Sequence, residues 1–149
     1  MSDVLNVQIS LETPTGWVDL EDELNGYYLH SDTMGTRSGT HRKTEVSNEY
    51  VAGTFVVRAV RENVTEALVI YVQGATPFQL KERVKVIEDG FDQLHYNVMI
   101  KDSDSVETWN CQLADYTLET SQPYQFATLA LIRATVPRLP QVTRVQVVP

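Results

Sequence analysis

The residues of this chain that could do chemistry are few and lie far apart in the sequence. Its three histidines, His30, His41 and His95, belong to no His-x-x-x-His or Glu-x-x-His pair of the kind that places metal ligands on one helical face. The single cysteine, Cys111, lies in an alternating strand-like pattern, which favours a small buried side chain over a nucleophile. We therefore expect no catalytic residue and no metal site.

Two acidic runs have the composition of a cation site but not its spacing. Asp-Ser-Asp at 102–104 begins like a calcium loop, which needs glycine at its sixth position and glutamate at its twelfth. This chain has Glu107 and Leu113 there. Three adjacent acids at 21–23 cannot all point the same way on an ordinary backbone. Because the chain also has no phosphate-binding or dinucleotide-binding glycine motif, we expect no cofactor and no enzymatic activity.

Length and composition indicate one globular domain. The chain has 149 residues, 42% of them hydrophobic, and a length near 150 residues allows a single core to hold the fold. One cysteine cannot form an internal disulfide. The first residues lack the pattern of a signal peptide, and no segment reaches the roughly 20 apolar residues that span a membrane. We expect a protein made in the cytoplasm, with no membrane partner.

The net charge of −8 is concentrated at the amino-terminal end. Residues 1–36 contain seven acids and no lysine or arginine, a net −7, whereas residues 37–149 contain 13 acids and 12 bases, a net −1. An acidic segment repels phosphate and disfavours sequence-independent binding of nucleic acid. A solvated acidic edge that aids solubility is the simplest interpretation.

Strand patterns dominate the chain. We expect strands at 5–11, 17–20, 27–30, 50–60, 64–73, 96–101, 106–120 and 124–136. The two long runs at 50–60 and 64–73 are expected to pair as an antiparallel hairpin. Pro137 and Pro140 are expected to end the sheet, because neither can donate to a strand ladder. Residues 141–149 then form an extended tail, with a last strand-like piece at 145–148.

One helix is expected at about residues 77–92. Thr76 can cap it, Pro77 suits the first helical position, and Gln79 completes a capping box. An apolar stripe follows at helical spacing, formed by Leu80, Val84, Ile87, Phe91 and Leu94. The sequence therefore predicts a mainly β protein, an antiparallel β-sandwich or barrel flanked by this single helix.

The segment at about 31–48 is nearly free of apolar residues. Glycine, serine and threonine predominate there, together with the bases Arg37, Arg42 and Lys43. We expect a long loop or an extended hairpin arm, attached to a single domain at 1–140. A structureless stretch of this length inside a compact domain is uncommon and usually functional.

The stretch from Glu45 to Pro140, about two thirds of the chain, resembles a known family. It contains in order VAGTFVVR at 51–58, ALVIYVQG at 67–74, TPFQL at 76–80, QLHYNV at 93–98, WNCQLADY at 109–116 and VPRLP at 136–140. This order is similar to the tail-tube-type domain of long-tailed phages, and more narrowly to the minor tail and distal tail proteins of siphovirus-type tails. The resemblance implies a virion protein of the tail, assembled in the host cytoplasm.

The resemblance also implies partners and interfaces. Copies would join as a ring, a hexamer or trimer, whose sheets form a channel for the transient passage of phage DNA, with other tail proteins above and below. The arm would reach a neighbouring copy through Arg37, Arg42, Lys43 and Glu45. The acids would face the channel, where they repel DNA, or the ring interface. These acids are Glu12, Asp19, Glu21, Asp22 and Glu23.

Three other interpretations remain open. The first is a tail terminator, which would cap the tube at its other end. The second is a small β-barrel that carries an apolar ligand, with an interior lined by Trp17, Tyr27, Tyr28, Trp109 and Tyr116. The third, and the least favoured, is an enzyme that uses His95 and Asp115.

Overall fold

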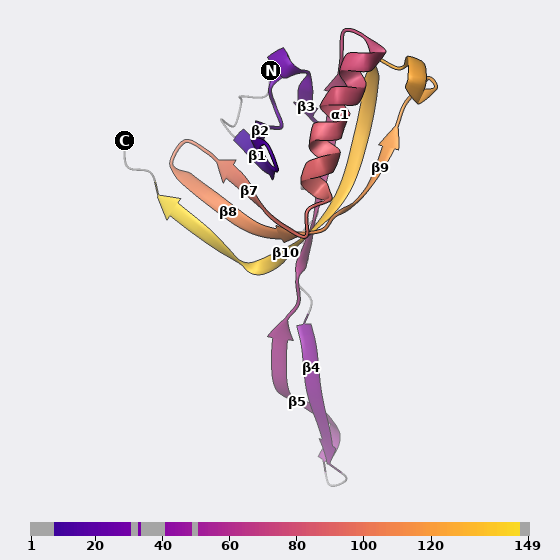
Figure 1. Ribbon diagram of the computed structural model, residues 1–149. Coiled ribbons are helices and arrows are strands. Elements are labelled where there is room, and N and C mark those ends of the chain that lie inside the picture. The colour runs from indigo at the N-terminus through magenta and orange to yellow at the C-terminus, as the bar shows by residue number, and fades with distance from the viewer. Residues whose placement is uncertain (1–7, 31–32, 34–40, 49–50, 147–149) are drawn as a thin grey trace.

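The computed structural model describes residues 8–30, 33, 41–48 and 51–146, with the backbone alone for 41–48 and 51–61 (Figure 1). Within these residues the chain forms ten strands, one α-helix and two short 3-10 helices. Their bounds are β1 (Gln8–Thr13), β2 (Gly16–Asp19), η1 (Glu23–Asn25), β3 (Tyr27–Leu29), β4 (His41–Asn48), β5 (Val51–Arg61), β6 (Val64–Gln73), α1 (Pro77–Phe91), β7 (His95–Lys101), β8 (Ser105–Gln112), β9 (Asp115–Glu119), η2 (Tyr124–Phe126) and β10 (Leu129–Gln146).

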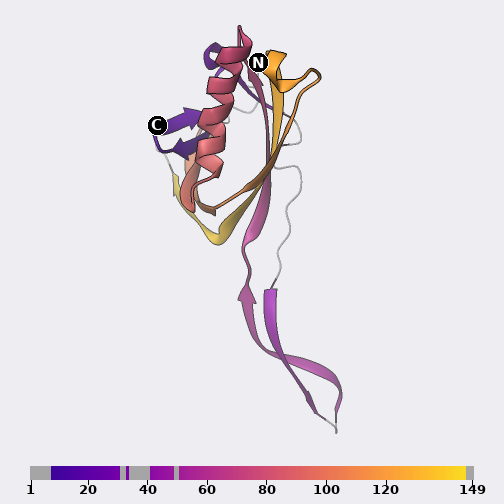
Figure 2. The same ribbon diagram turned by 45° about the vertical axis from the view of Figure 1, so that its right-hand side comes forward.

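Eight strands form one antiparallel sheet that curls almost into a barrel. Seven follow the order β2-β1-β7-β8-β10-β6-β3, and β9 pairs with residues Leu131 to Thr135 in the first half of β10. The sheet wraps around one side of α1 (Figures 1 and 2). The predicted fold, mainly β and antiparallel with a single flanking helix, is confirmed. No helix in the part of the chain that the structure describes is long and apolar enough to cross a membrane.

Helix α1 begins and buries its apolar stripe as the sequence predicts. The Thr76 hydroxyl accepts a hydrogen bond from the backbone N–H of Gln79 at 3.2 Å. The Gln79 amide oxygen accepts one from the N–H of Ala75 at 2.7 Å, one residue before the cap. The stripe from Leu80 to Phe91 is fully buried. Leu94 is 70% exposed, contrary to the prediction, because the helix ends at Phe91 and Leu94 lies in the turn before β7.

One hydrophobic core lies between α1 and the inner face of the sheet. It is built from alternate residues of each strand, as in the series Leu68, Ile70 and Val72 on β6. On the helix, Gly90 is buried against β1. A β-carbon at Gly90 would lie 2.9 Å from Leu11 Cδ2, so glycine here lets the helix approach the sheet closely.

Strand β10 continues through both prolines, so the prediction that they end the sheet is wrong. It pairs with β6 as far as Arg138 and then with β8 from Val142 to Gln146. Along one edge of β10, pairing with β9 ends at Thr135 and pairing with β8 begins at Arg138, so Pro137 lies between the two partners. Pro140 lies within the register shift between Arg138 and Val142. A strand tolerates proline at such irregularities, because no ladder donor is needed there. The predicted tail therefore belongs to the sheet up to Gln146, and residues 147–149 lie outside the described residues.

The run predicted as one strand at 106–120 is two strands. β8 ends at Gln112 and β9 begins at Asp115. The break falls at Ala114, which is buried and donates its N–H to the Phe91 carbonyl at 3.2 Å. The contact with the end of α1 interrupts the ladder at this point, and both strands lie along the same edge of β10.

The strand at 51–61 does not pair with β6, contrary to the predicted hairpin. β5 pairs with β4, with register shifts after Thr44 and Ser47, and the two form a separate sheet. The expected arm at 31–48 is therefore a β4–β5 hairpin that includes the apolar run of β5. It extends away from the barrel, and β5 leads directly into β6 (Figures 1 and 2). The start of the predicted strand at 5–11 lies outside the described residues, as do most of residues 31–40.

Replacing Gly90 with valine should lower the free energy of unfolding by about 1–3 kcal/mol, because the side chain would overpack the contact between α1 and β1. Glu82→Val at an exposed position of the same helix is the matched control and should cost less than about 1 kcal/mol, the loss of helix propensity. Urea unfolding curves of both variants measure the difference. Equal losses would show that the close approach at Gly90 is not required.

Candidate functional site

A buried ion pair occupies the centre of the sheet. The side chains of Arg138 on β10 and Glu66 on β6 are 2% and 3% exposed. Two guanidinium nitrogens, Nε and Nη2, donate to Glu66 Oε1 at 3.2 and 3.1 Å, and Nη1 donates to the Leu139 carbonyl at 3.0 Å. Such a pair is retained only where its geometry and its hydrogen bonds compensate the loss of hydration.

The ion pair lies where β10 changes partners. Arg138 pairs with Val64 of β6 on one side and with Cys111 of β8 on the other. Its guanidinium carbon lies 4.8 Å from the centre of the Trp109 ring, a cation–π contact. The charge therefore ties together three strands that are distant in sequence.

Glu66 and Arg138 are not among the predicted site residues, although the sequence contains a signal for them. In the alternating pattern of its strand, Glu66 falls on the same face as the buried residues Leu68 and Ile70. Arg138 likewise falls on the same face of β10 as the buried Val136. Two opposite charges at inward positions of two strands indicate a buried pair. A sequence alone does not show that the strands are neighbours.

Two polar side chains, Tyr96 of β7 and Cys111 of β8, are buried opposite each other in the sheet. Burial raises the pKa of the Cys111 thiol to about 12, although the positive charge of Arg138 opposes the shift. Burial also raises the pKa of Tyr96, whose hydroxyl has no hydrogen-bond partner among the described residues. The prediction that Cys111 is buried is confirmed.

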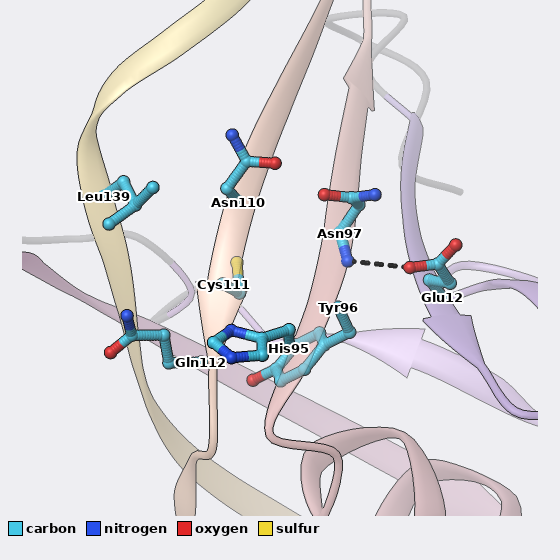
Figure 3. A pocket seen from close by; sticks show the side chains of 8 residues that line it. All are labelled: Glu12, His95, Tyr96, Asn97, Asn110, Cys111, Gln112 and Leu139. Atoms are coloured by element: carbon cyan, nitrogen blue, oxygen red, sulfur yellow. Dashed lines mark hydrogen bonds between the residues drawn. The ribbon is translucent and has the colours of Figure 1, made fainter.

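A polar hollow of about 290 Å³ opens on the sheet where β1, β7, β8 and β10 lie side by side (Figure 3). Asn97 pairs with Asn110 across β7 and β8, and His95 pairs with Gln112. The Glu12 carboxylate accepts a hydrogen bond from the N–H of Asn97 at 3.1 Å. The hollow therefore offers amides, one imidazole and one carboxylate, which can form hydrogen bonds. Cys111 also lines the hollow, and burial raises the pKa of its thiol to about 12, which favours the protonated form at neutral pH.

The five acids predicted to face a channel or an interface do not form one cluster. Glu12 and Asp19 lie on the outer face of β1 and β2, on the side away from the buried Leu11. Asp19 accepts from the N–H of Glu21 at 2.9 Å and from the Gln8 amide at 3.0 Å.

The other acids, at 21–23, lie at the start of η1, at one end of the barrel. Asp22 accepts from the Asn25 amide at 2.6 Å, so this carboxylate stabilises the local turn. Which surface any of the five acids faces in an assembly stays a prediction.

The predicted interface residues of the arm lie on β4, with one exception. Arg42, Lys43 and Glu45 pair with Val60, Ala59 and Val56 of β5. Arg37 lies outside the described residues. The backbone thus places three of the four residues on the hairpin that extends from the barrel (Figure 1). Their interface role stays a prediction.

The acidic run at 102–104 forms the tight turn between β7 and β8. Hydrogen bonds from the N–H groups of Asp104 and Ser105 to Asp102 Oδ1, at 3.0 and 2.7 Å, lower the pKa of Asp102 to about 2. This is an Asx turn, in which the carboxylate stabilises the reversal of the chain. Among the described residues, no group of three or more His, Cys, Asp or Glu side chains could hold a metal ion.

The aromatic residues proposed for a ligand-carrying interior do not line a common cavity. Tyr27 and Trp109 are packed in the core, whereas Trp17 is 46% exposed. The Tyr116 hydroxyl donates to Asp92 at 3.0 Å on the surface near the end of α1. Core packing accounts for the buried aromatic residues, and the carrier interpretation has no geometric support.

Comparison with known proteins gives little further information. No family model matches the chain, and no curated protein matches it. Among solved structures, the chain is similar to a chain of the cryo-EM structure of the anti-feeding prophage (AFP) baseplate, 6-fold symmetrised. The two are 11% identical, over 97% of this chain and 95% of that one, with a TM-score of 0.45. A likeness of this size does not establish a shared function.

Replacing Arg138 with methionine should lower the free energy of unfolding by about 3–5 kcal/mol, because the Glu66 carboxylate would be left buried without its partner. The double variant with Glu66→Met should recover most of the loss. Arg133→Met breaks the exposed pair with Glu119 and serves as the control, with a cost under about 1 kcal/mol. Denaturant unfolding measures all three, and equal costs for the two arginines would contradict the assignment.

The Cys111 thiol should resist alkylation by iodoacetamide at about pH 8 in the folded protein and react fully in denaturant. Its folded pKa lies above the unfolded value of about 8.5. The stability that the neutral thiol contributes is therefore complete below about pH 8.5 and is lost as the pH rises toward 12. Mass spectrometry of the labelled chain provides the readout. Rapid labelling of the native protein would contradict the burial of this group.

Proposed function

We propose that this chain is a structural virion protein of a phage tail, without catalytic activity, that assembles as a ring and continues a DNA-conducting channel. The observation that carries the proposal is the β4–β5 hairpin, which pairs with no strand of the eight-stranded sheet. An isolated two-stranded hairpin is marginally stable in water. A hairpin of this length therefore calls for a partner surface on another molecule.

The edges of the sheet support lateral association as well. The two ends of the strand order are β2 and β3, which have four and three residues. Edge strands present unpaired backbone groups that can pair with another chain. Their shortness disfavours open aggregation and suits contacts of limited size, such as those between neighbours in a closed ring.

Charge also favours contact between copies. Residues 41–61 contain four bases and two acids, whereas residues 19–23 contain four acids and no base. Opposite charges on two parts of one chain favour association between copies. The interface would use Arg42, Lys43 and Glu45 of the hairpin, together with Arg37.

The acids have a second role in this proposal. Those that do not meet a neighbour's hairpin would repel the phosphates of passing DNA from the channel wall. The ring would be a hexamer or trimer in the tail of the virion, at the tip or tube, between other tail proteins. A tail terminator at the opposite end of the tube is the second candidate, since it would need the same ring and the same arm.

The purified chain should form a ring or polymer whose mass is a multiple of six or three copies of 16.9 kDa. A variant in which a short glycine-serine linker replaces residues 42–60 should remain folded and become monomeric, because the barrel does not depend on β4 or β5 for its sheet. Native mass spectrometry and negative-stain microscopy measure the assembly.

Circular dichroism of the linker variant is the control for folding. A wild-type chain that stays monomeric at every concentration would contradict the proposal. Unchanged assembly of a folded linker variant would instead remove the hairpin from the interface.

A further inference from the structure

Four large apolar side chains are exposed at the end of the barrel that lies opposite the hairpin. Leu24 of η1 is 92% exposed, Phe78 of α1 69%, Phe126 of η2 68% and Leu129 of β10 48%. We call these four residues the apical patch. Single exposed apolar residues are ordinary, but several at one end of a small domain mark an interaction surface.

Backbone contacts bring the elements of the apical patch to one place. Gln73, the last residue of β6, pairs with Leu129 and donates its N–H to the Gly26 carbonyl at 2.8 Å, next to η1. Gly74 donates to the Thr128 carbonyl at 2.9 Å, close to η2. Helix α1 begins three residues later. The elements η1, η2, the start of α1 and the start of β10 therefore surround the end of β6 (Figures 1 and 2).

Gly26 is required for this arrangement. It has φ +77°, and an added β-carbon would lie 2.1 Å from the Gln73 carbonyl oxygen. Only glycine allows η1 to turn and pack this closely against β6. The position of Leu24 at the apical end is thus fixed by the backbone.

One member of the apical patch, Leu129, also borders a hollow of about 330 Å³. Leu129 lines it together with Tyr71 and Leu131, and Glu119 lies on its border. Tyr71 and Leu131 are opposite each other on β6 and β10, on the outer face of the sheet. The apical end therefore combines exposed apolar side chains with a recess that can receive apolar side chains of a partner.

We propose that the apical patch binds the β4–β5 hairpin of a second copy of this chain, in a head-to-tail contact. This inference rests on the proposed function, because it names the surface that receives the arm. The hairpin and the elements that carry the patch lie at opposite ends of one molecule (Figures 1 and 2), so a contact between them joins copies along one direction. Contacts of this heterologous kind generate rings or filaments.

The composition of the two surfaces matches. β5 contains Phe55 and four valines, and β4 and β5 pair with no strand of their own barrel. The hairpin region 41–61 has a net charge of +2, whereas the acidic run 21–23 directly precedes Leu24 in the sequence. An apolar centre bordered by opposite charges is the usual composition of a specific interface.

The first experiment compares substitutions at the two ends of α1. The variant Phe78→Ser with Phe126→Ser removes two members of the apical patch. Leu94→Ser removes an equally exposed side chain, 70% against 69% for Phe78, after the other end of the helix. We expect the double variant to need at least about tenfold more protein for half-assembly in sedimentation velocity, and Leu94→Ser to assemble like the wild type.

The second experiment identifies the contact directly. Copies carrying Ser47→Cys on β4 are mixed with copies carrying Phe126→Cys under mild oxidation. The native Cys111 is buried and does not compete. Disulfide-linked heterodimers should exceed the homodimers of either variant. Thermal unfolding shows that each variant is folded.

The outcomes separate this inference from the proposed function. Loss of assembly in the double variant alone, with preferential heterodimer crosslinks, supports the apical patch. Equal assembly of wild type, Leu94→Ser and the double variant would overturn the patch and leave the ring proposal standing. A wild-type chain that stays monomeric would contradict the ring proposal itself, and this inference with it.

Discussion

The removal of two opposite charges from water constrains this fold more than any other interaction described above. Arg138 and Glu66 can be buried only if β10 lies beside β6 in one register, since a shift by one residue would turn either side chain to the opposite face. The same arginine contacts the Trp109 ring of β8, so the register of a third strand is fixed as well. The ion pair therefore specifies an arrangement rather than adding much stability, because a well-packed apolar pair could replace it at little cost.

The barrel and the β4–β5 hairpin differ in how far they depend on the rest of the chain for their hydrogen bonds and packing. The barrel has a continuous core that α1 closes on one side, and its central strand is held along 18 residues by three partners. The hairpin has its own ladder and no share in the sheet of the barrel. A two-stranded hairpin outside any larger sheet is marginally stable in water, so the proposed contact with a second copy would stabilise it.

Local signals in the sequence predicted local structure, and failed where the outcome depends on distant residues. Thr76 and Pro77 mark the start of α1, because capping and proline geometry are decided within one turn. The apolar run at 50–60 predicted a strand close to the observed β5 but with the wrong partner, since strand periodicity does not identify the neighbour. Pro137 and Pro140 indicated the end of a sheet, yet a change of partners accommodates both. Asp19 and Asp22 were predicted to face a channel or an interface, and the sequence did not show that their carboxylates accept hydrogen bonds from nearby groups.

The direct passage from β5 into β6 also has a mechanical consequence. A pull on the hairpin enters the barrel at Glu62 and Asn63, where the Asn63 amide is held by Gln112 of β8 at 3.1 Å. From there the load runs along the axis of β6, whose ten residues are paired with β10. Ladder hydrogen bonds lie perpendicular to the strands, so such a load shears all of them together instead of opening them one at a time. A domain built in this way can transmit tension applied to its hairpin into its core without unzipping.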